Sequence, residues 1–202
     1  MARGKEGRVS GAFVAIVGPS GSGKDSIIDH ARLAVAERGG IIFPQRQITR
    51  PSGAGEDHQP VSEGEFEEAK DRGEFALTWR AHGLGYGIPA HVFGAVDAGH
   101  VVVANLSRGV LKYLPGLFAN VHVVRVSVSD EVRLARIIAR GREDQNAAAS
   151  RMARPDPAPD QPADLEIVND GTLAEASGKL VEFLIGVLAT AGGTTELHRQ
   201  PS

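Results

Sequence analysis

A glycine-rich loop near the N-terminus constrains the fold more than any other stretch of this sequence. The loop follows the apolar run Gly11–Val17, precedes the apolar positions of Ile27–Leu33, and meets the spacing GxxxxGK with Gly18, Gly23 and Lys24. Glycines let backbone N–H groups wrap a polyphosphate, the next helix presents its positive end, and the lysine reaches the outer phosphates. The order of strand, loop and helix predicts a nucleotide-phosphate site formed by Gly18, Pro19, Ser20, Gly21, Ser22, Gly23, Lys24, Asp25 and Ser26.

One position departs from the usual pattern of such loops. The residue after the lysine is ordinarily Ser or Thr, whose hydroxyl binds Mg²⁺, and here it is Asp25. A carboxylate is also a hard oxygen ligand, so Asp25 could hold Mg²⁺ directly or through water. The alternative is an acidic residue that the helix dipole favours in the first turn, and the sequence leaves both interpretations open.

The composition excludes several classes of site and partner. The chain has 202 residues, of which 42% are hydrophobic, and this fits a single domain over residues 1–202. The absence of cysteine excludes disulfides, thiolate metal sites and cysteine nucleophiles. A net charge of −3, a polar N-terminus and no long apolar run argue against nucleic-acid or membrane partners and against a signal peptide. We expect a cytoplasmic protein, whose oligomeric state the sequence leaves open.

Strand-like and helix-like segments alternate along the chain, which predicts an α/β fold with a parallel sheet covered by helices. In the first half we expect a strand at 11–17, a helix from about Lys24 to Arg38, and a strand from Ile41–Phe43 that leads into Gln45–Pro51. An exposed loop at Ser52–Pro60 and a helix that begins at the capping box Ser62–Glu65 are expected to follow. The last segments of this half are a strand at Phe75–Trp79 and an irregular segment at His82–Gly87. We expect His58 and His82 to be surface residues and Trp79 to be part of the core.

The second half predicts the most buried strands. They are Val101–Ala104 and Val121–Val128. We then expect a helix after Ser129 that ends near Gly141, a strand at Leu165–Asp170 and a helix at Leu173–Leu188. The two helices are expected to supply the core with Val132, Leu134, Ala135, Ile137 and Ile138, and with Ala176, Leu180, Phe183, Leu184 and Val187. The proline-rich segment 142–163 predicts a mobile lid, and residues 191–202 predict a disordered tail.

The order of the motifs resembles that of guanylate-kinase-like nucleotide kinases, from Phe13 to Leu188. The motifs are the loop 18–24, Thr49-Arg50-Pro51 with Gly55-Glu56, Gly83 with Tyr86-Gly87, Arg140-Gly141-Arg142, and Val168-Asn169-Asp170. Within that superfamily, Lys24-Asp25-Ser26, Arg46, Ser107-Arg108 and Arg140–Glu143 resemble the ribose 1,5-bisphosphate phosphokinases of phosphonate breakdown. The resemblance implies a P-loop kinase fold with a core at about 11–50, 101–141 and 165–190, an acceptor-binding region at about 46–90 and a lid at about 142–163.

Departures from guanylate kinases indicate a different acceptor. Where those enzymes use a Glu and a Ser to read guanine, this chain has the apolar Leu77 and the cationic Arg46. A pocket that exchanges base-reading groups for a fixed positive charge suits an acceptor with a second phosphate and no base. The second arginine of the guanylate kinase loop falls on Gly53. Asn105 and Ser107 stand where guanylate kinases have an acidic pair after the central strand, and this replacement strengthens the case for Asp25 as the Mg²⁺ residue.

The candidate site residues therefore fall into three groups. Lys24 and the lid arginines are the candidate catalytic residues, since a mobile segment can close positive charge over a transferring phosphate. Charge and hydrogen-bonding capacity indicate the acceptor-binding residues. The lid group is Arg142, Arg151 and Arg154, and the acceptor group is Arg46, Arg50, Glu56, Tyr86, Ser107 and Arg108.

The reaction that the resemblance implies is transfer of the γ-phosphoryl group of ATP, with Mg²⁺, to the 1-phosphate of ribose 1,5-bisphosphate. A phosphate oxygen is already ionised at neutral pH, so this chemistry requires no general base, only positioning and charge neutralisation. Two alternatives remain at this point: a guanylate or other nucleoside monophosphate kinase, and a catalytically silent interaction module of the same fold.

Overall fold

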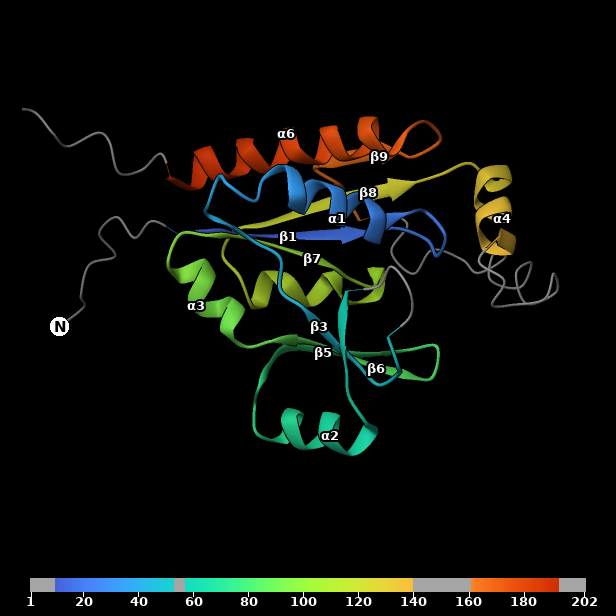
Figure 1. Cartoon of the computed structure of the whole chain (residues 1–202). Coiled ribbons are helices and arrows are strands. Elements are labelled where there is room, and N and C mark those ends of the chain that lie inside the picture. Colours follow the sequence, from blue (N-terminus) through green and yellow to red (C-terminus); the bar gives the residue numbers. More distant parts are fainter. Residues whose placement is uncertain (1–9, 53–56, 140–160, 193–202) are drawn as a thin grey trace, which may run out of the picture.

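Two sheets and their covering helices organise the chain. The computed structural model describes residues 10–52, 57–139 and 161–192, and Figure 1 shows a helical layer, a parallel sheet, a second helical layer, a smaller sheet and a last helix stacked in that order. The predicted α/β class with a parallel sheet between helices is confirmed. In the described residues no helix is both long enough and apolar enough to span a membrane.

The larger sheet is parallel throughout and has the order β2-β7-β1-β8-β9. Its central strand β1 is buried on both faces, as expected for a continuous apolar run between two helical layers. The strands are β1 (Ala12–Val17), β2 (Ile41–Ile42), β7 (Val101–Asn105), β8 (Val121–Ser127) and β9 (Leu165–Val168).

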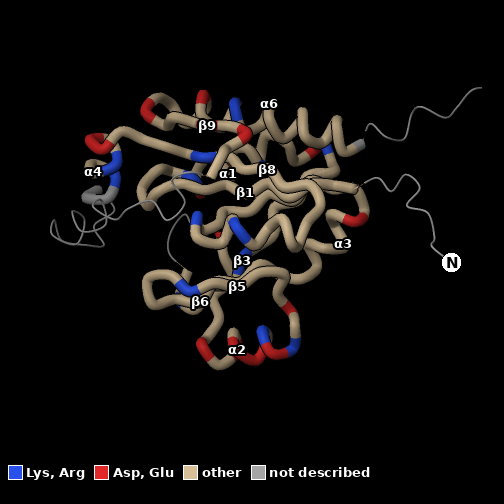
Figure 2. Tube along the Cα trace, turned by 180° about the vertical axis from the view of Figure 1, so that it is seen from behind, with Lys and Arg blue, Asp and Glu red and all other residues tan. Residues whose placement is uncertain are grey.

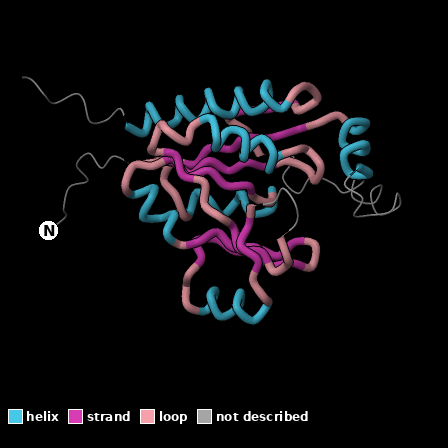
Figure 3. The backbone as a smooth tube through the Cα atoms, in the orientation of Figure 1, coloured by secondary structure: helices cyan, strands magenta, loops and turns pink. Residues whose placement is uncertain are grey.

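Helices cover this sheet on both faces (Figure 3). On one face α1 (Lys24–Ala34) and α6 (Leu173–Gly192) pack against alternate residues of β1 such as Val14 and Ile16. On the other face α3 (His91–Asp97) and the 3₁₀ helix η1 (Arg108–Gly116) pack against Phe13, Ala15 and Val17. The alternation of the strand therefore divides the core into two clusters.

The smaller sheet has the order β4-β3-β6-β5 and packs beside the second cluster, which Leu77 and Trp79 join. Its strands are β3 (Arg46–Ile48), β4 (His58–Pro60), β5 (Phe75–Ala81) and β6 (Leu84–Pro89). Helix α2 (Glu63–Asp71) covers the opposite face and carries the predicted capping box between Ser62 and Glu65. Figure 2 shows its charged residues at the end of the molecule farthest from β9 and α6.

The expectation of irregular structure at His82–Gly87 is wrong, because residues from Leu84 onward form β6. The glycines permit this strand rather than break it. A Cβ on Gly87 would overlap the ring of Phe75, so glycine lets an aromatic ring lie directly on the strand backbone. His82, at φ 55°, is exposed in the turn, as expected.

The expected loop at Ser52–Pro60 is partly wrong as well. Residues 58–60 form β4 alongside β3. The expectation that His58 is a surface residue is wrong, since it is buried with its Nε2 3.3 Å from the carbonyl oxygen of Arg50. The strand expected at Ile41–Pro51 is split between the two sheets as β2 and β3. The polar sequence of β4 shows no strand pattern, because its pairing with β3 depends on contacts outside the segment itself.

Three helix expectations need correction. Helix α1 ends at Ala34 and continues only as turns, whereas α6 extends past the expected end through Ala191 and Gly192. Helix α4 (Asp130–Ala139) lies at the end of β8, away from the middle of the large sheet (Figure 1). Val132, Leu134 and Ala135 are therefore not buried, whereas Arg133 is. The burial of Ile137 and Ile138, also expected in the core, lies outside what the structure describes.

Candidate phosphate-transfer site

The glycine-rich loop lies between β1 and α1, as the sequence predicts. Gly23 precedes the helix with φ 87°, a conformation that side chains with a Cβ rarely adopt, and a Cβ there would overlap the amide of Asn169. Lys24 donates from Nζ to the carbonyl oxygens of Gly18, at 2.8 Å, and Pro19, at 2.9 Å. The lysine thus lies along the loop whose phosphates it is expected to contact.

Three side chains from later in the chain lie against the outside of this loop. Asn169 is 4% exposed and donates from Nδ2 to the carbonyl oxygen of Ser22 at 2.8 Å. Arg133 donates from Nε to the carbonyl oxygen of Ser20 at 2.9 Å. Beside Gly23, one terminal nitrogen of Arg136 is buried without a hydrogen-bond acceptor in the part of the chain that the structure describes. A buried guanidinium nitrogen beside a phosphate loop is suited to receive an anion.

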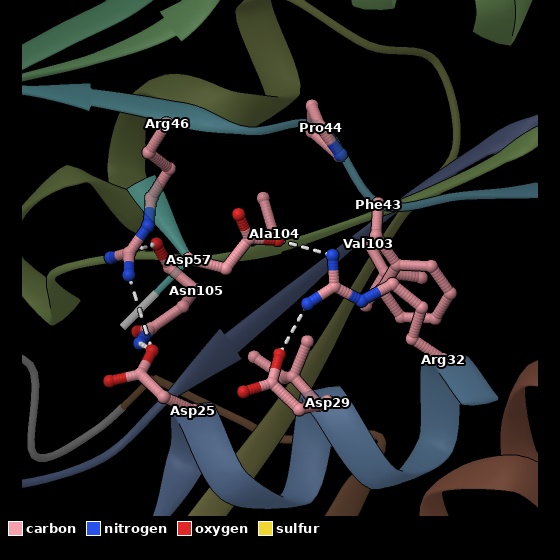
Figure 4. A pocket seen from close by; sticks show the side chains of 11 residues that line it. Asp25, Asp29, Arg32, Phe43, Pro44, Arg46, Asp57, Val103, Ala104 and Asn105 are labelled. Atoms are coloured by element: carbon pink, nitrogen blue, oxygen red, sulfur yellow. Dashed lines mark hydrogen bonds and ion pairs between the residues drawn. The ribbon is translucent and has the colours of Figure 1, made fainter. Parts of the chain in front are cut away.

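Asp25, Arg46 and Asn105 meet where the two sheets face each other (Figure 4). They come from the first turn of α1, from β3 and from the end of β7. Arg46 donates from NH2 to Oδ1 of Asp25 and from NH1 to the carbonyl oxygen of Asn105, both at 3.2 Å. Asn105 in turn donates from Nδ2 to the same Asp25 oxygen at 2.6 Å.

The same three residues line a cleft between α1 and the strands. At its other end Arg32 forms ion pairs with both Asp29 and Asp57, and Gln45 donates to Asp57 at 2.8 Å. The hydrogen bond from Arg32 lowers the pKa of Asp57 below its usual value. Asp57 therefore stays ionised at neutral pH and accepts hydrogen bonds only.

The other described acceptor residues lie on strands of the two sheets or directly after them. Tyr86 stacks on Trp79 across β5 and β6, with ring centroids 5.1 Å apart and nearly parallel planes. Arg50 follows β3, and Ser107 and Arg108 follow β7 just beyond Asn105. Trp79 is half-buried and packs against the second core cluster, in accord with its expected role in the core.

The remaining predicted site residues lie outside the described part of the chain. They are Glu56 and the lid arginines Arg142, Arg151 and Arg154. Their roles stay predictions, as does the expected lid over residues 142–163.

Sequence reasoning did not select Asn105, Arg133, Arg136 and Asn169 as site residues. Asn105 ends the buried strand β7 and Asn169 follows β9, at the edge where ligands of parallel sheets bind, a signal that could have identified them. Arg133 and Arg136 looked like ordinary charges between apolar helical positions, and only the position of α4 brings them to the loop.

The arrangement can hold a polyphosphate at the loop, and both arginines that line the neighbouring cleft are paired with aspartates. Mg²⁺ usually binds one or two carboxylates together with phosphate oxygens. Both hydrogen bonds described at Asp25 use Oδ1, so Oδ2 can bind this ion when phosphates supply the other ligands. Among the described residues no cluster of three or more His, Cys, Asp or Glu side chains could hold a metal ion by itself.

Comparisons with known proteins agree with this geometry. No family model matches the chain. It is 55% identical over 177 residues to the ribose 1,5-bisphosphate phosphokinase PhnN of Pseudofrankia inefficax, covering 87% of this chain and 91% of that protein. It is 42% identical over 174 residues to the protein of that name from Methylobacterium radiotolerans, covering 86% and 97%. In structure it resembles the guanylate kinase of Anaplasma phagocytophilum, with a TM-score of 0.64, 20% identity and coverage of 88% and 86%.

Proposed function

Because this chain belongs to the family of ribose 1,5-bisphosphate phosphokinases, we propose that it phosphorylates ribose 1,5-bisphosphate with ATP. The products are 5-phospho-α-D-ribose 1-diphosphate and ADP. The observation that carries the proposal is the direct contact that Asp25 and Arg46 make between the phosphate loop and the second sheet. That sheet offers a cationic side chain, and residue 77 is not a base-reading carboxylate. The silent-module alternative finds no support in a loop that keeps its lysine in place.

The reaction consists of one displacement at phosphorus. An oxygen of the acceptor 1-phosphate bonds to the γ-phosphorus of ATP while the bond from that phosphorus to the β–γ bridging oxygen breaks, and ADP leaves with the electron pair. The attacking oxygen carries no proton at neutral pH. The residues of this chain therefore bring two polyanions together and neutralise charge, without a general base.

In this mechanism Lys24 moves from the loop carbonyl oxygens to the outer phosphates of ATP. Arg136 supplies its buried guanidinium nitrogen to the same phosphates, and Arg133 and Asn169 keep the loop in shape from outside. Bound Mg²⁺ would supply charge neutralisation, and Asp25 is the residue of this chain proposed to hold it. The lid arginines Arg142, Arg151 and Arg154 are proposed to complete the charge around the transferring group.

Arg46, Arg50, Glu56, Tyr86, Ser107 and Arg108 are proposed as the acceptor-binding residues, within a region of about 46–90 and the segment after β7. Guanine is a poor fit because Leu77 offers no hydrogen-bond acceptor. Each base N–H left unpaired beside it costs about 1–3 kcal/mol. The family resemblance supports a role in phosphonate breakdown. The absence of cysteine is compatible with the reducing cytoplasm that we propose as its location.

The first prediction is tested by a screen of acceptors with ATP and Mg²⁺, following ADP release. Ribose 1,5-bisphosphate is expected to exceed GMP in kcat/KM by at least about a hundredfold, since a site rejects ligands that leave its polar groups unpaired. Arg46→Ala is expected to raise KM for the sugar bisphosphate more than it lowers kcat. Gln47→Ala, which removes the adjacent exposed contact with Gln59, is the matched control.

A higher kcat/KM for GMP than for ribose 1,5-bisphosphate would refute the proposed acceptor. A P-loop kinase acting on a nucleoside monophosphate would then be the remaining interpretation.

A further inference from the structure

Asn105 contacts Arg46 and Asp25 at the same time. Its main-chain oxygen accepts from NH1 of Arg46, and its side-chain amide donates to the Asp25 oxygen that also accepts from NH2 of Arg46. The three residues thus form a closed ring of hydrogen bonds drawn from β3, α1 and β7. A ring of this kind fixes the guanidinium plane in a way that a single ion pair does not.

The amide at residue 105 is the chemically suitable partner for this ring. The side chain of Asp25 is 40% exposed, so without a donor at 2.6 Å its carboxylate would turn toward water. A carboxylate at residue 105 would place a second negative charge beside Asp25 and repel it. Asn105 therefore determines where the Asp25 carboxylate points, and through it where the guanidinium of Arg46 lies.

Arg46 retains donors for a ligand after these contacts. Its side chain is only 16% exposed and it lines the cleft, while a guanidinium carries more N–H donors than the two bonds to Asp25 and Asn105 use. The ion pair with Asp25 offsets part of the positive charge of Arg46. Recognition of a phosphate by this arginine therefore depends on the direction of its remaining donors more than on bulk attraction.

We propose that Asn105 is a positioning residue for acceptor recognition, which acts through Arg46 and makes no contact with the transferring phosphoryl group. The inference rests on the proposed function, because the ligand that Arg46 would bind is a phosphate of the sugar bisphosphate. It assigns Asn105 chiefly to KM for the acceptor rather than to the chemical step.

A double-mutant cycle tests this role. Binding of ribose 1,5-bisphosphate is measured by titration calorimetry, without nucleotide or Mg²⁺, for the wild type, Asn105→Ala, Arg46→Ala and the double variant. Each single substitution is expected to weaken binding by about tenfold, the value of one charge-assisted hydrogen bond, and the double variant is expected to bind no more weakly than Arg46→Ala alone. In turnover assays Asn105→Ala should raise KM for the acceptor by more than it lowers kcat, because the substitution leaves the Asp25 carboxylate available to Mg²⁺.

Two further variants keep the test decisive. Gln47→Ala, on the neighbouring residue of β3, should bind the acceptor like the wild type. Asn105→Asp conserves the volume and so preserves the packing, yet it should also weaken acceptor binding through repulsion from Asp25.

Losses that add in the double variant, or Asn105→Ala and Asn105→Asp proteins that bind like the wild type, would overturn the inference alone. A wild-type protein that neither binds nor phosphorylates ribose 1,5-bisphosphate would overturn the proposed function and this inference with it.

Discussion

Asn169 connects the last strand of the large sheet to the phosphate loop, and this contact leads to a prediction. Its buried amide satisfies the carbonyl oxygen of Ser22, so Asn169→Ala leaves that oxygen without its donor. We expect a loss of about 1–3 kcal/mol in the free energy of unfolding and a higher KM for ATP, because the loop loses its support. Urea denaturation and steady-state kinetics measure the two effects.

Asn120→Ala is the matched control for this variant. Asn120 donates to the carbonyl oxygen of Gly11 at 3.1 Å at the opposite end of β1, far from the loop. Its removal should leave KM for ATP unchanged. An Asn169→Ala enzyme with wild-type KM for ATP would show that the loop keeps its shape without this amide.

Helix α2 provides a prediction at the level of the element. Ser62 accepts from the main-chain N–H of Glu65 at 3.2 Å, while the Glu65 carboxylate accepts from the main-chain N–H of Ser62 at 2.8 Å. Ser62→Ala should lower the free energy of unfolding by about 1 kcal/mol, the usual value of an N-cap. The check is thermal or chemical denaturation, with Glu68→Ala on the exposed side of the same helix as the control.

The same capping box should depend on pH. The hydrogen bond from the main chain of Ser62 lowers the pKa of Glu65. A carboxyl whose pKa is lowered by folding stabilises the folded state above its ordinary pKa and loses that contribution as the pH falls through the lowered value. The stability difference between the wild type and Glu65→Ala, which removes this carboxylate, should therefore shrink in acid. A difference that stays constant down to pH 2 would count against the carboxylate's role.

The sequence predicted elements well where local pattern and local chemistry determine them. The apolar strands β1, β7 and β8, the loop before α1 and the cap of α2 follow from a few neighbouring residues each. The strands β4 and β6 were not predicted, because their polar or glycine-rich sequences become strands only through β3 and the ring of Phe75.

The site followed the same division. Gly18–Lys24 could be predicted from spacing, and the structure also brings Arg46 to Asp25 as part of one cleft. The contacts of Asn105 and Asn169 could not be predicted, since each joins residues that are more than fifty positions apart. Helix α4 was placed wrongly because its apolar residues suggested a core face, whereas its contact with the loop depends on Arg133.

At the scale of the whole molecule, two ion pairs join the P-loop helix to the smaller sheet. Asp25 of α1 pairs with Arg46 of β3, and Arg32 of α1 pairs with Asp57 beside β4, so the charges run in opposite directions at the two ends of the cleft. Such a pattern favours one register between the helix and the sheet, because a shift would bring like charges together.

Arg32→Ala should therefore loosen the smaller sheet relative to α1. We expect faster hydrogen exchange of the β3 and β4 amides at neutral pH, with little change in the large sheet. Folding lowers the pKa of Asp57, so its contribution is present above the ordinary aspartate pKa and lost as the pH falls through the lowered value. The difference in exchange between variant and wild type should fade in acid.

Arg72→Ala is the control for this prediction, since Arg72 pairs with Glu74 within the smaller unit and does not bridge to α1. Equal exchange of β3 and β4 in the wild type and the Arg32→Ala variant at neutral pH would mean that the Arg32–Asp57 pair does not hold the sheet against α1.

The strand order also governs how the chain can assemble on the ribosome. β1 pairs with β7 and β8, and β2 pairs with β7, all from Val101 onward. The described part of β1 and β2 therefore has no partner strand in this sheet until about half of the chain has been made. The smaller sheet draws its strands from Arg46–Pro89 and can pair earlier. Long-range parallel pairing is slow, and unpaired apolar strands are prone to aggregation while they wait. The apolar strand that leads into the P-loop is thus the segment most in need of a chaperone during synthesis.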